Sequence, residues 1–450
     1  FDKNEIMSES MSKSMSESMS ELEIARIQVI LQYLTVHDTI NSAKAAELLD
    51  VEKKTASRLL SKAEKVEVLI SKGKTKDNLG ISDKILKMKI GDSMFEKIKQ
   101  LMTGNLSKGG RQVYIDDLRV IATVFVIGVH TVSLAATMTE YGSIPFRVLT
   151  IFNFIFLSCN LLFVMLSGAL LLPVKNESIG SFFRKRFTKV AIPLVVYYIL
   201  YIVAKEGLVW LRPDHWILML RRILTGAPME APHFWLVYVI IWLYVLTPFM
   251  RYIVHNIPDT VLSGVIGVVF AICALDTYLP LYGINSVFGI VVDSYAGTFL
   301  LGYFLSEKCS RKVENFFMFT GFLSFIETCM WIWNGNDYAN YIYQNSPTMM
   351  CFTAAIFLLV KRLASQKTKS SFFVQLISRY SYSILLIHWG VLHFVVKQKL
   401  HVNVLGGGIV GGCIVMMVLT LFISAIGAMI LDNTLLKWIQ KPFTKKQRQK

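Results

Sequence analysis

The chain has 450 residues, of which 54% are hydrophobic and 17% charged, and its mean hydropathy is +0.49. Because an ordinary globular chain carries about a quarter charged residues, this composition excludes an ordinary soluble protein and indicates a protein embedded in lipid. The formal net charge of +16 would suggest nucleic-acid binding in a soluble chain, but most of it lies in short segments between apolar stretches, where it sets membrane orientation. The six cysteines show no paired spacing, so we expect neither a disulfide framework nor a metal site.

Residues 1–20 form a serine-rich, low-complexity segment with methionine at every fourth position from Met7 to Met19. We predict a flexible or marginally helical leader there. The segment is acidic and lacks the basic stretch and apolar core of a secretory signal, so no cleavable signal peptide is expected.

A small soluble domain is predicted over 21–106. Its elements, in order, are helical patterns at 21–33, 42–49 and 51–63 and an alternating, wing-like stretch at 66–78. A short turn at Asp50 and Val51 joins the second and third helices into a helix-turn-helix outline. Together with a turn at Gly73 in the alternating stretch, these features resemble a winged-helix domain.

The third helix and the wing of this domain are basic, and such a surface could contact DNA. The basic residues are Lys53, Lys54, Arg58, Lys62, Lys72, Lys74 and Lys76. The net charge of the region is only mildly positive, so a second interpretation stays open: a solvated face on a protein-interaction domain or a vestigial one. DNA and a protein are therefore both candidate partners for this domain.

Ten apolar stretches in 113–435 are long enough to cross a hydrocarbon core of about 30 Å. They lie at 120–138, 150–172, 190–211, 236–252, 261–279, 287–305, 316–333, 347–363, 374–395 and 404–431. The sequence thus predicts an all-α polytopic membrane protein with about ten transmembrane helices behind the small soluble domain, and a basic tail at 436–450.

An even number of spans places both termini on one side of the membrane. The loops on that side are basic, with Lys175, Arg184, Lys185, Arg186, Lys189, Lys308, Arg311, Lys312, Lys361, Arg362, Lys367 and Lys369, whereas the loops 277–286 and 334–346 contain no Lys or Arg. The positive-inside rule then assigns both termini to the cytosol. One loop after the third span is also basic, but 216–224 looks like an amphipathic helix in the interface, where such charges are tolerated.

Two ionisable residues of the first span lie on one helical stripe. His130 is in the middle of the span, and Arg119 precedes it by eleven residues. In an α-helix, two residues eleven positions apart lie within about 20° of the same face and about 16 Å apart along the axis. Because a histidine costs free energy in the membrane, we interpret His130 as a general base or transient acyl carrier and Arg119 as a phosphate or carboxylate ligand. A packing histidine and a topological anchor are the structural alternatives.

Six short motifs follow one another along the chain. They are Asp116 to Arg119 followed by ten residues and His130, 163–168 ending in Ser167 and Gly168, the basic 183–189 ahead of Pro193, 233–238 with its His-x-Trp pattern ahead of Pro248, Gly302 with Tyr303, and 381–388 ending in His388. In this order, and on ten spans, they resemble the acyltransferase-3 family of membrane O-acyltransferases over about 113–435. In the basic motif Lys189 stands where the family more often has arginine, which keeps the charge but loses bidentate geometry.

The resemblance implies an enzyme that takes an acyl group, acetyl in the first instance, from cytosolic acyl-CoA. The residues that it assigns to the donor are Arg119, Ser167, Gly168, Arg186, Lys189, Trp235 and Tyr238, and those that it assigns to catalysis are His130, Asp116 and His388. For several of them helix packing or interfacial placement is an equal alternative. His388 could face His130 across the bundle, as acid, orienter or acceptor-binding group.

The acceptor implied is a hydroxyl of a carbohydrate or lipid-linked glycan, reached from the opposite face of the cell membrane, so the activity would be an O-acetylation at the cell envelope. No extracytoplasmic domain follows the last span, so onward transfer would need another protein. Two other functions remain open at this stage. A transporter or flippase would use His130 with Glu327 or Asp293 to relay protons, and a membrane-tethered transcriptional regulator would act through the N-terminal domain.

Overall fold

The computed structural model describes residues 19–34, 37, 39–65, 68–71, 79–81, 113–174, 177–226, 231–284, 294–335 and 346–444. The chain divides into two compact units, Phe1–Gly104 and Asn105–Lys450. Several predicted features lie outside the described residues: the leader up to residue 18, the basic tip of the wing at 72–76, the boundary segment near 107–111, Asp293 and the tail from 445.

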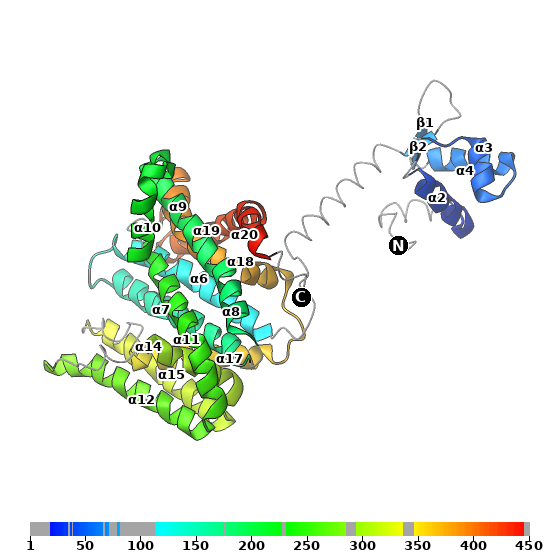
Figure 1. The fold of residues 1–450 in the computed structure, drawn as a ribbon. Coiled ribbons are helices and arrows are strands. Elements are labelled where there is room, and N and C mark those ends of the chain that lie inside the picture. The colour runs from blue at the N-terminus through cyan, green and yellow to red at the C-terminus, as the bar shows by residue number, and fades with distance from the viewer. Residues whose placement is uncertain are drawn as a thin grey trace. The chain divides into compact units, whose positions relative to one another are not determined.

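Among its described residues, the first unit has three helices and a two-stranded antiparallel sheet (Figure 1). The elements are α2 (Glu21–Tyr33), α3 (Ser42–Leu49), α4 (Lys53–Lys65), β1 (Leu69–Ser71) and β2 (Leu79–Ile81). Asn41 caps α3, and Asp50 ends it with a φ of 49°, a left-handed conformation that Asp tolerates. The strands pair Leu69 with Ile81, and helix α4 begins two residues later than the pattern predicted. The arrangement matches the predicted order of elements, while the winged-helix assignment stays a prediction.

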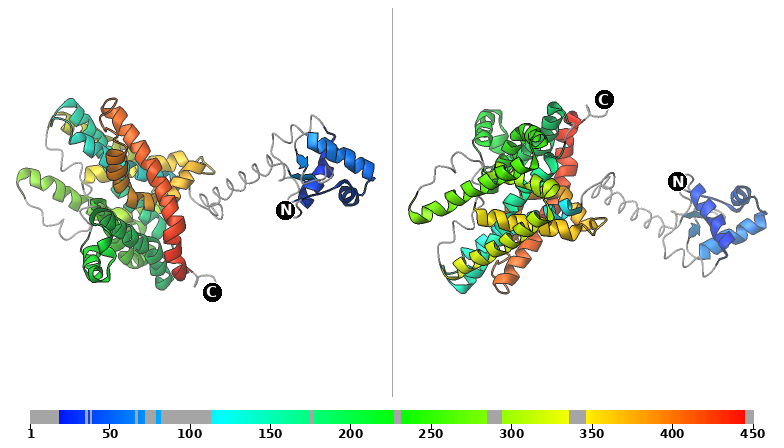
Figure 2. Two further views of the ribbon diagram at one scale, coloured as in Figure 1. Left: turned by 90° about the horizontal axis from the view of Figure 1, so that it is seen from above. Right: turned by 90° about the horizontal axis from the view of Figure 1, so that it is seen from below.

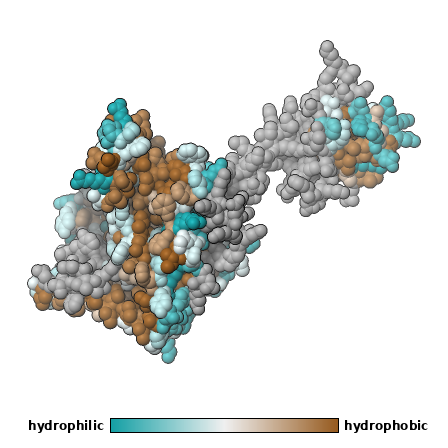
Figure 3. All heavy atoms as spheres, in the orientation of Figure 1, coloured by the Kyte–Doolittle hydropathy of each residue, from teal (hydrophilic) through white to brown (hydrophobic). Residues whose placement is uncertain are grey.

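The second unit is helical, and much of its visible surface is apolar (Figure 3). Its main helices are α6 (Val113–Ala136), α7 (Ile144–Leu171), α8 (Ile179–Arg186), α9 (Ile192–Glu206), α10 (Trp216–Thr225), α11 (Trp235–Asn256), α12 (Asp259–Tyr278), α14 (Ser294–Tyr303), α15 (Arg311–Trp333), α17 (Pro347–Ala364), α18 (Phe372–Gly390), α19 (Ile409–Leu431) and α20 (Lys437–Thr444). Eight helices of the described residues are long and apolar enough to cross a membrane. The predicted all-α multi-pass membrane fold is thereby confirmed.

The remaining two predicted spans correspond to α14 and α18. Helix α14 begins at Ser294, and the first part of the predicted span lies outside the described residues. Helix α18 continues through a π-helical segment, Val391–Lys399, without a break. Polar residues such as Arg379 and His388 lower its mean hydropathy. Helix α19 likewise runs on through the π-helical turn Asp432–Leu436 into α20, and Figure 2 shows the three as one long helix that turns from orange to red.

The basic motif lies on a helix, whereas the sequence pattern placed it in a loop. Ser178 caps α8, and the helix continues through the π-helical turn Phe187–Ala191 into α9. Pro193 explains the wider turn, because its ring would clash with the carbonyl of Lys189 four residues earlier and it has no N–H to donate. The side chains of Arg186 and Lys189 therefore have fixed places on one rigid element.

Helices α7 and α14 approach each other through two glycines. A Cβ on Gly168 would collide with the carbonyl oxygen of Phe299, and one on Gly302 would collide with the backbone of Met165. Small residues at such positions let two helix backbones approach closely in a membrane. The Ser-Gly and Gly-Tyr motifs of the sequence are thus two sides of one helix contact.

Replacing Gly302 with valine should destabilise the membrane unit, because backbone atoms cannot move aside as a flexible side chain would. Overpacking typically costs about 1–3 kcal/mol, so we expect a lower melting temperature in detergent. Gly264→Val on α12 is the matched control, since a Cβ there meets nothing within 4 Å. Equal melting temperatures for the two variants would contradict the close contact.

Candidate functional site

Three histidines from separate parts of the second unit meet inside it. His130 comes from the middle of α6, His233 from the 3-10 turn Pro232–Phe234 before α11, and His388 from α18. The ring centroid of His388 lies 5.2 Å from that of His130 and 4.7 Å from that of His233. The indole of Trp389 packs edge-on against His130 at 4.8 Å. The helix bundle therefore gathers three imidazoles, of which His388 and His233 are buried and His130 is partly accessible.

Backbone carbonyls determine which ring nitrogens of the two buried histidines carry the proton. Nδ1 of His388 lies 2.7 Å from the carbonyl oxygen of Leu385, and Nε2 of His233 lies 3.2 Å from that of Leu386. A carbonyl only accepts, so these nitrogens donate. Nε2 of His388 and Nδ1 of His233 are then left with lone pairs, and neither has a hydrogen-bond partner among the described residues. Each imidazole thus offers a buried acceptor next to His130.

The hydroxyl of Tyr201 replaces one backbone hydrogen bond of α18 beside His388. The amide of Gly390 donates to the hydroxyl of Tyr201 at 2.8 Å, and this hydroxyl donates to the carbonyl of Leu386 at 3.1 Å. In a regular α-helix the Gly390 amide would bond to the Leu386 carbonyl directly. Gly390 allows the approach, since a Cβ there would lie 3.1 Å from the tyrosine oxygen. Tyr201 and His233 together satisfy the Leu386 carbonyl at the place where α18 changes to a π-helix.

A larger cavity of about 720 Å³ lies toward the Arg119 end of α6. Its charged and polar lining includes Arg119, Ser167, Arg186, Lys189, Ser378, Arg379, Asp432 and Gln440. Four of these side chains are cations and one is a carboxylate, and the hydroxyl of Ser383 donates to that carboxylate, on Asp432. The surplus of positive charge suits a ligand with several negative charges, such as phosphates.

His130 and His233 line a second, smaller cavity of about 110 Å³, and it shares a wall with the larger one. His130, His233 and Trp235 face the smaller cavity, and Leu385 contributes to the lining of both. Arg119 and His130 stand on one unbroken helix, about 16 Å apart along its axis. A cation-lined space and a histidine-lined space therefore adjoin each other along α6.

Ionic and aromatic contacts hold the basic segment in place. The guanidinium of Arg186 stacks on the rings of Phe182 and Tyr244, at 5.1 and 5.5 Å from their centroids. Glu177, just before α8, binds Lys185 at 2.8 Å and Arg251 of α11 at 3.1 Å. Burial raises the pKa of Glu177, but hydrogen bonds from these two cations outweigh it and hold the pKa below its ordinary value. The carboxylate is therefore charged at neutral pH and ties α8 to α11.

The sequence-predicted site residues divide between the two cavities and the surrounding structure. Arg119, Ser167, Arg186 and Lys189 line the larger cavity, and His130 and Trp235 line the smaller one. His388 contacts His130 directly. Asp116 is buried outside both cavity linings, where its carboxylate accepts a hydrogen bond from Ser378 at 2.6 Å.

Two predicted donor ligands line neither cavity. Gly168 packs against α14, as described above, and the hydroxyl of Tyr238 donates to the carbonyl of Ile223 in α10 at 2.7 Å. The position of Gly168 matches the helix packing that the sequence left open for it, while interfacial placement of Tyr238 stays a prediction. Their assignment to the donor remains a prediction without a contact to support it.

Three residues of the site were missed from sequence. His233 belongs to the His-x-Trp motif but was not predicted as a site residue, although a histidine beside an apolar span is itself a signal. Arg379 lies within the predicted span 374–395, and Asp432 directly follows the predicted span 404–431, so a charge in or beside an apolar stretch could have marked both by the same argument. Only the fold shows that both face the cavity of Arg119.

Comparison with known proteins gives one match. A family model described as an acyltransferase domain, of the acyltransferase-3 type, matches residues 112–431. No curated protein and no solved structure matches the chain significantly. The matched range covers every element that contributes to the two cavities except α20 and the π-helical turn Asp432–Leu436 before it.

Replacing Tyr201 with phenylalanine should loosen α18 around His388. Removing the hydroxyl breaks the bridge between Gly390 and Leu386, and each hydrogen bond of this kind is worth about 0.5–1.5 kcal/mol. Hydrogen exchange of the segment 384–395, measured by mass spectrometry, should become several-fold faster. Tyr198→Phe, which removes another buried hydroxyl of α9, one that donates to the carbonyl of Gly226, should leave that segment unchanged. Unaltered exchange in Tyr201→Phe would show that the bridge is dispensable.

Proposed function

Since this chain belongs to the acyltransferase-3 family and is a membrane acyltransferase, we propose that it transfers a short acyl group, acetyl in the first instance, from acyl-CoA to a hydroxyl of a carbohydrate or lipid-linked glycan. The observation that carries this proposal is the pair of adjoining cavities. One offers cations for the donor, the other offers imidazoles for proton transfer, and Leu385 borders both.

The larger cavity is the proposed donor site. Arg119, Arg186 and Lys189 would bind the phosphates of acyl-CoA, and Arg379 adds a fourth cation to the same lining. Charge-assisted hydrogen bonds to phosphate are stronger than neutral ones. The separation of about 16 Å between Arg119 and His130 is of a length that an extended pantetheine arm spans, so the thioester would lie beside the histidines.

His130 is the proposed base, because it is the histidine that remains partly accessible within the smaller cavity. It would remove the proton of the acceptor hydroxyl while the hydroxyl oxygen attacks the thioester carbonyl. A C–O ester bond forms, the C–S bond breaks, and the proton passes to the departing thiolate. A transient acyl group on His130 is the alternative course, and the two differ only in whether a labelled enzyme accumulates.

His388 and His233 would support His130. Their proton-free nitrogens are acceptors beside it, so either could orient His130 by accepting the single N–H of its neutral ring. Asp116, which holds Ser378 at the edge of the donor site, fits a positioning role better than direct proton transfer, because it lies fourteen residues before His130, about 21 Å along α6.

We further propose that both termini lie in the cytosol and that the protein resides in the cell membrane. The basic loops support this orientation, and it places the donor cavity on the side where acyl-CoA is made. The acceptor would then approach the histidines from the opposite face. Incubation of the purified protein with radiolabelled acetyl-CoA tests the proposal: we expect slow hydrolysis or self-labelling, and neither would occur if the donor were a different class of molecule.

Replacing Arg186 and Lys189 together with glutamine should weaken acyl-CoA binding by at least about a hundredfold, since each charge-assisted bond is worth about 1.5–3 kcal/mol. Calorimetry with the purified protein measures this. Arg184→Gln with Lys312→Gln is the matched control, because it removes the same charge from exposed positions outside the cavity lining. If both double variants bind equally, the cluster serves membrane topology alone.

Replacing His130 with glutamine should abolish transfer and leave acyl-CoA binding near wild type. A positioned general base contributes typically a hundred- to ten-thousand-fold, so less than about one hundredth of the turnover should remain. His388→Gln should cause a smaller loss. Turnover with a fixed acceptor, together with donor binding, separates the two roles. More than about a tenth of wild-type turnover in His130→Gln would make it a packing residue and leave His388 as the base.

A further inference from the structure

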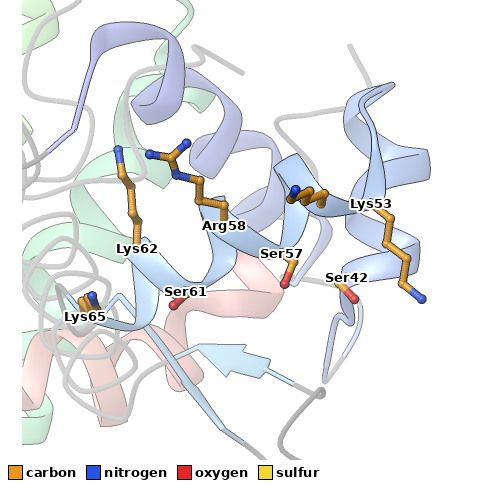
Figure 4. A pocket seen from close by; sticks show the side chains of 8 residues that line it. Ser42, Lys53, Ser57, Arg58, Ser61, Lys62 and Lys65 are labelled. Carbon is orange, nitrogen blue, oxygen red and sulfur yellow. The ribbon is translucent and has the colours of Figure 1, made fainter.

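We propose that the first unit binds double-stranded DNA through the outer face of α4, a function separate from acyl transfer. This basic face consists of Lys53, Lys54, Ser57, Arg58, Ser61 and Lys65, and a hollow of about 740 Å³ lies along it. Figure 4 shows Arg58 extending to one side of α4, beside Lys62, and the hydroxyls of Ser57 and Ser61 on the other.

The fold presents this helix as a rigid element. Its inner face places Ala56, Leu59, Leu60 and Ala63 in the core of the unit, where each is at most 4% exposed. Lys62 binds Glu23 of α2 at 2.6 Å and so fixes α4 against its neighbour. Only two residues, Val51 and Glu52, separate Asp50 from Lys53, so α3 and α4 are joined by the short turn of a helix-turn-helix unit.

The charges of the basic face are available to a ligand. Lys53, Lys54, Arg58 and Lys65 are exposed, and none forms an ion pair with a described residue. Lys62, by contrast, forms an ion pair with Glu23. The thirteen residues of α4 thus carry four cations with two serine hydroxyls between them. The cations offer contacts to phosphates, and Arg58 and the serines offer contacts to base edges.

Charge and shape favour DNA over a lipid surface. A helix that lies on a membrane needs an exposed apolar face to enter the headgroup region. On α4 both leucines and both alanines point into the core. The exposed residues of the helix are Thr55, Glu64 and those of the basic face. The face therefore has charge for a polyanion but no apolar surface for lipid insertion.

Shape also distinguishes DNA from double-stranded RNA. The major groove of B-form DNA is about 12 Å wide and admits an α-helix, whereas the major groove of A-form RNA is too deep and narrow for side chains to read. Helix α4, with its row of exposed basic and hydroxyl side chains, fits the first groove. The hydroxyl of Ser42, at the start of α3 and in the same hollow, is placed to contact the adjoining phosphate backbone.

The test uses the full chain in nanodiscs of zwitterionic lipid and a fluorescent 30-base-pair DNA duplex of mixed sequence. Anisotropy should show binding that weakens as salt rises, because counterions are released from the duplex. Lys54→Gln with Arg58→Gln should weaken binding at least about tenfold and reduce the slope of log affinity against log salt by about 2. An RNA duplex of the same length should bind at least about tenfold more weakly.

Arg26→Gln with Lys369→Gln is the matched control, because it removes the same charge from α2 and from a loop of the membrane unit. DNA affinity within about twofold of wild type in this control supports the proposal. Three results would overturn it: no DNA binding at low salt, equal loss in both double variants, or equal affinity for DNA and RNA. Flotation with anionic vesicles that depends on Lys54 and Arg58, without DNA binding, would assign the face to lipid instead.

Discussion

The hydrogen bonds around the Leu386 carbonyl hold the histidine cluster together. In hydrocarbon an unpaired backbone group costs several kcal/mol, and no water is at hand to satisfy it. The hydroxyl of Tyr201 stands between this carbonyl and the Gly390 amide, and the ring of His233 donates to the same oxygen. One carbonyl therefore joins α9, the start of α11 and α18, and His388 lies two residues beyond it.

The two cavities separate two kinds of electrostatic environment within one bundle. Arginines and a lysine surround the first, where stacking on Phe182 and Tyr244 and the ionic contacts of Glu177 keep the basic segment rigid. His130 and His233 line the second, and a backbone carbonyl holds the ring of His233. Because α6 carries Arg119 in one and His130 in the other, a single helix sets the distance between the cations of the first cavity and the imidazoles of the second.

Much of the fold follows from apolar length and helical period, and so it was predicted with small errors in the bounds. The basic motif was placed wrongly, because local charge suggests a loop whereas the cap at Ser178 and the π-helical turn before Pro193 keep the chain helical. His130 and Arg119 could be paired from their spacing on one helix. The contact of His130 with His233 and His388 could not, since it depends on packing between helices that no local pattern encodes.

The wall that Leu385 shares between the cavities limits what can approach His130. About 110 Å³ is open beside this imidazole, and Leu385 and Trp235 form part of its lining. A bulky group would need one of these side chains to move aside. Close packing makes that displacement costly, so the size of two side chains acts as a steric filter on the molecules that reach His130.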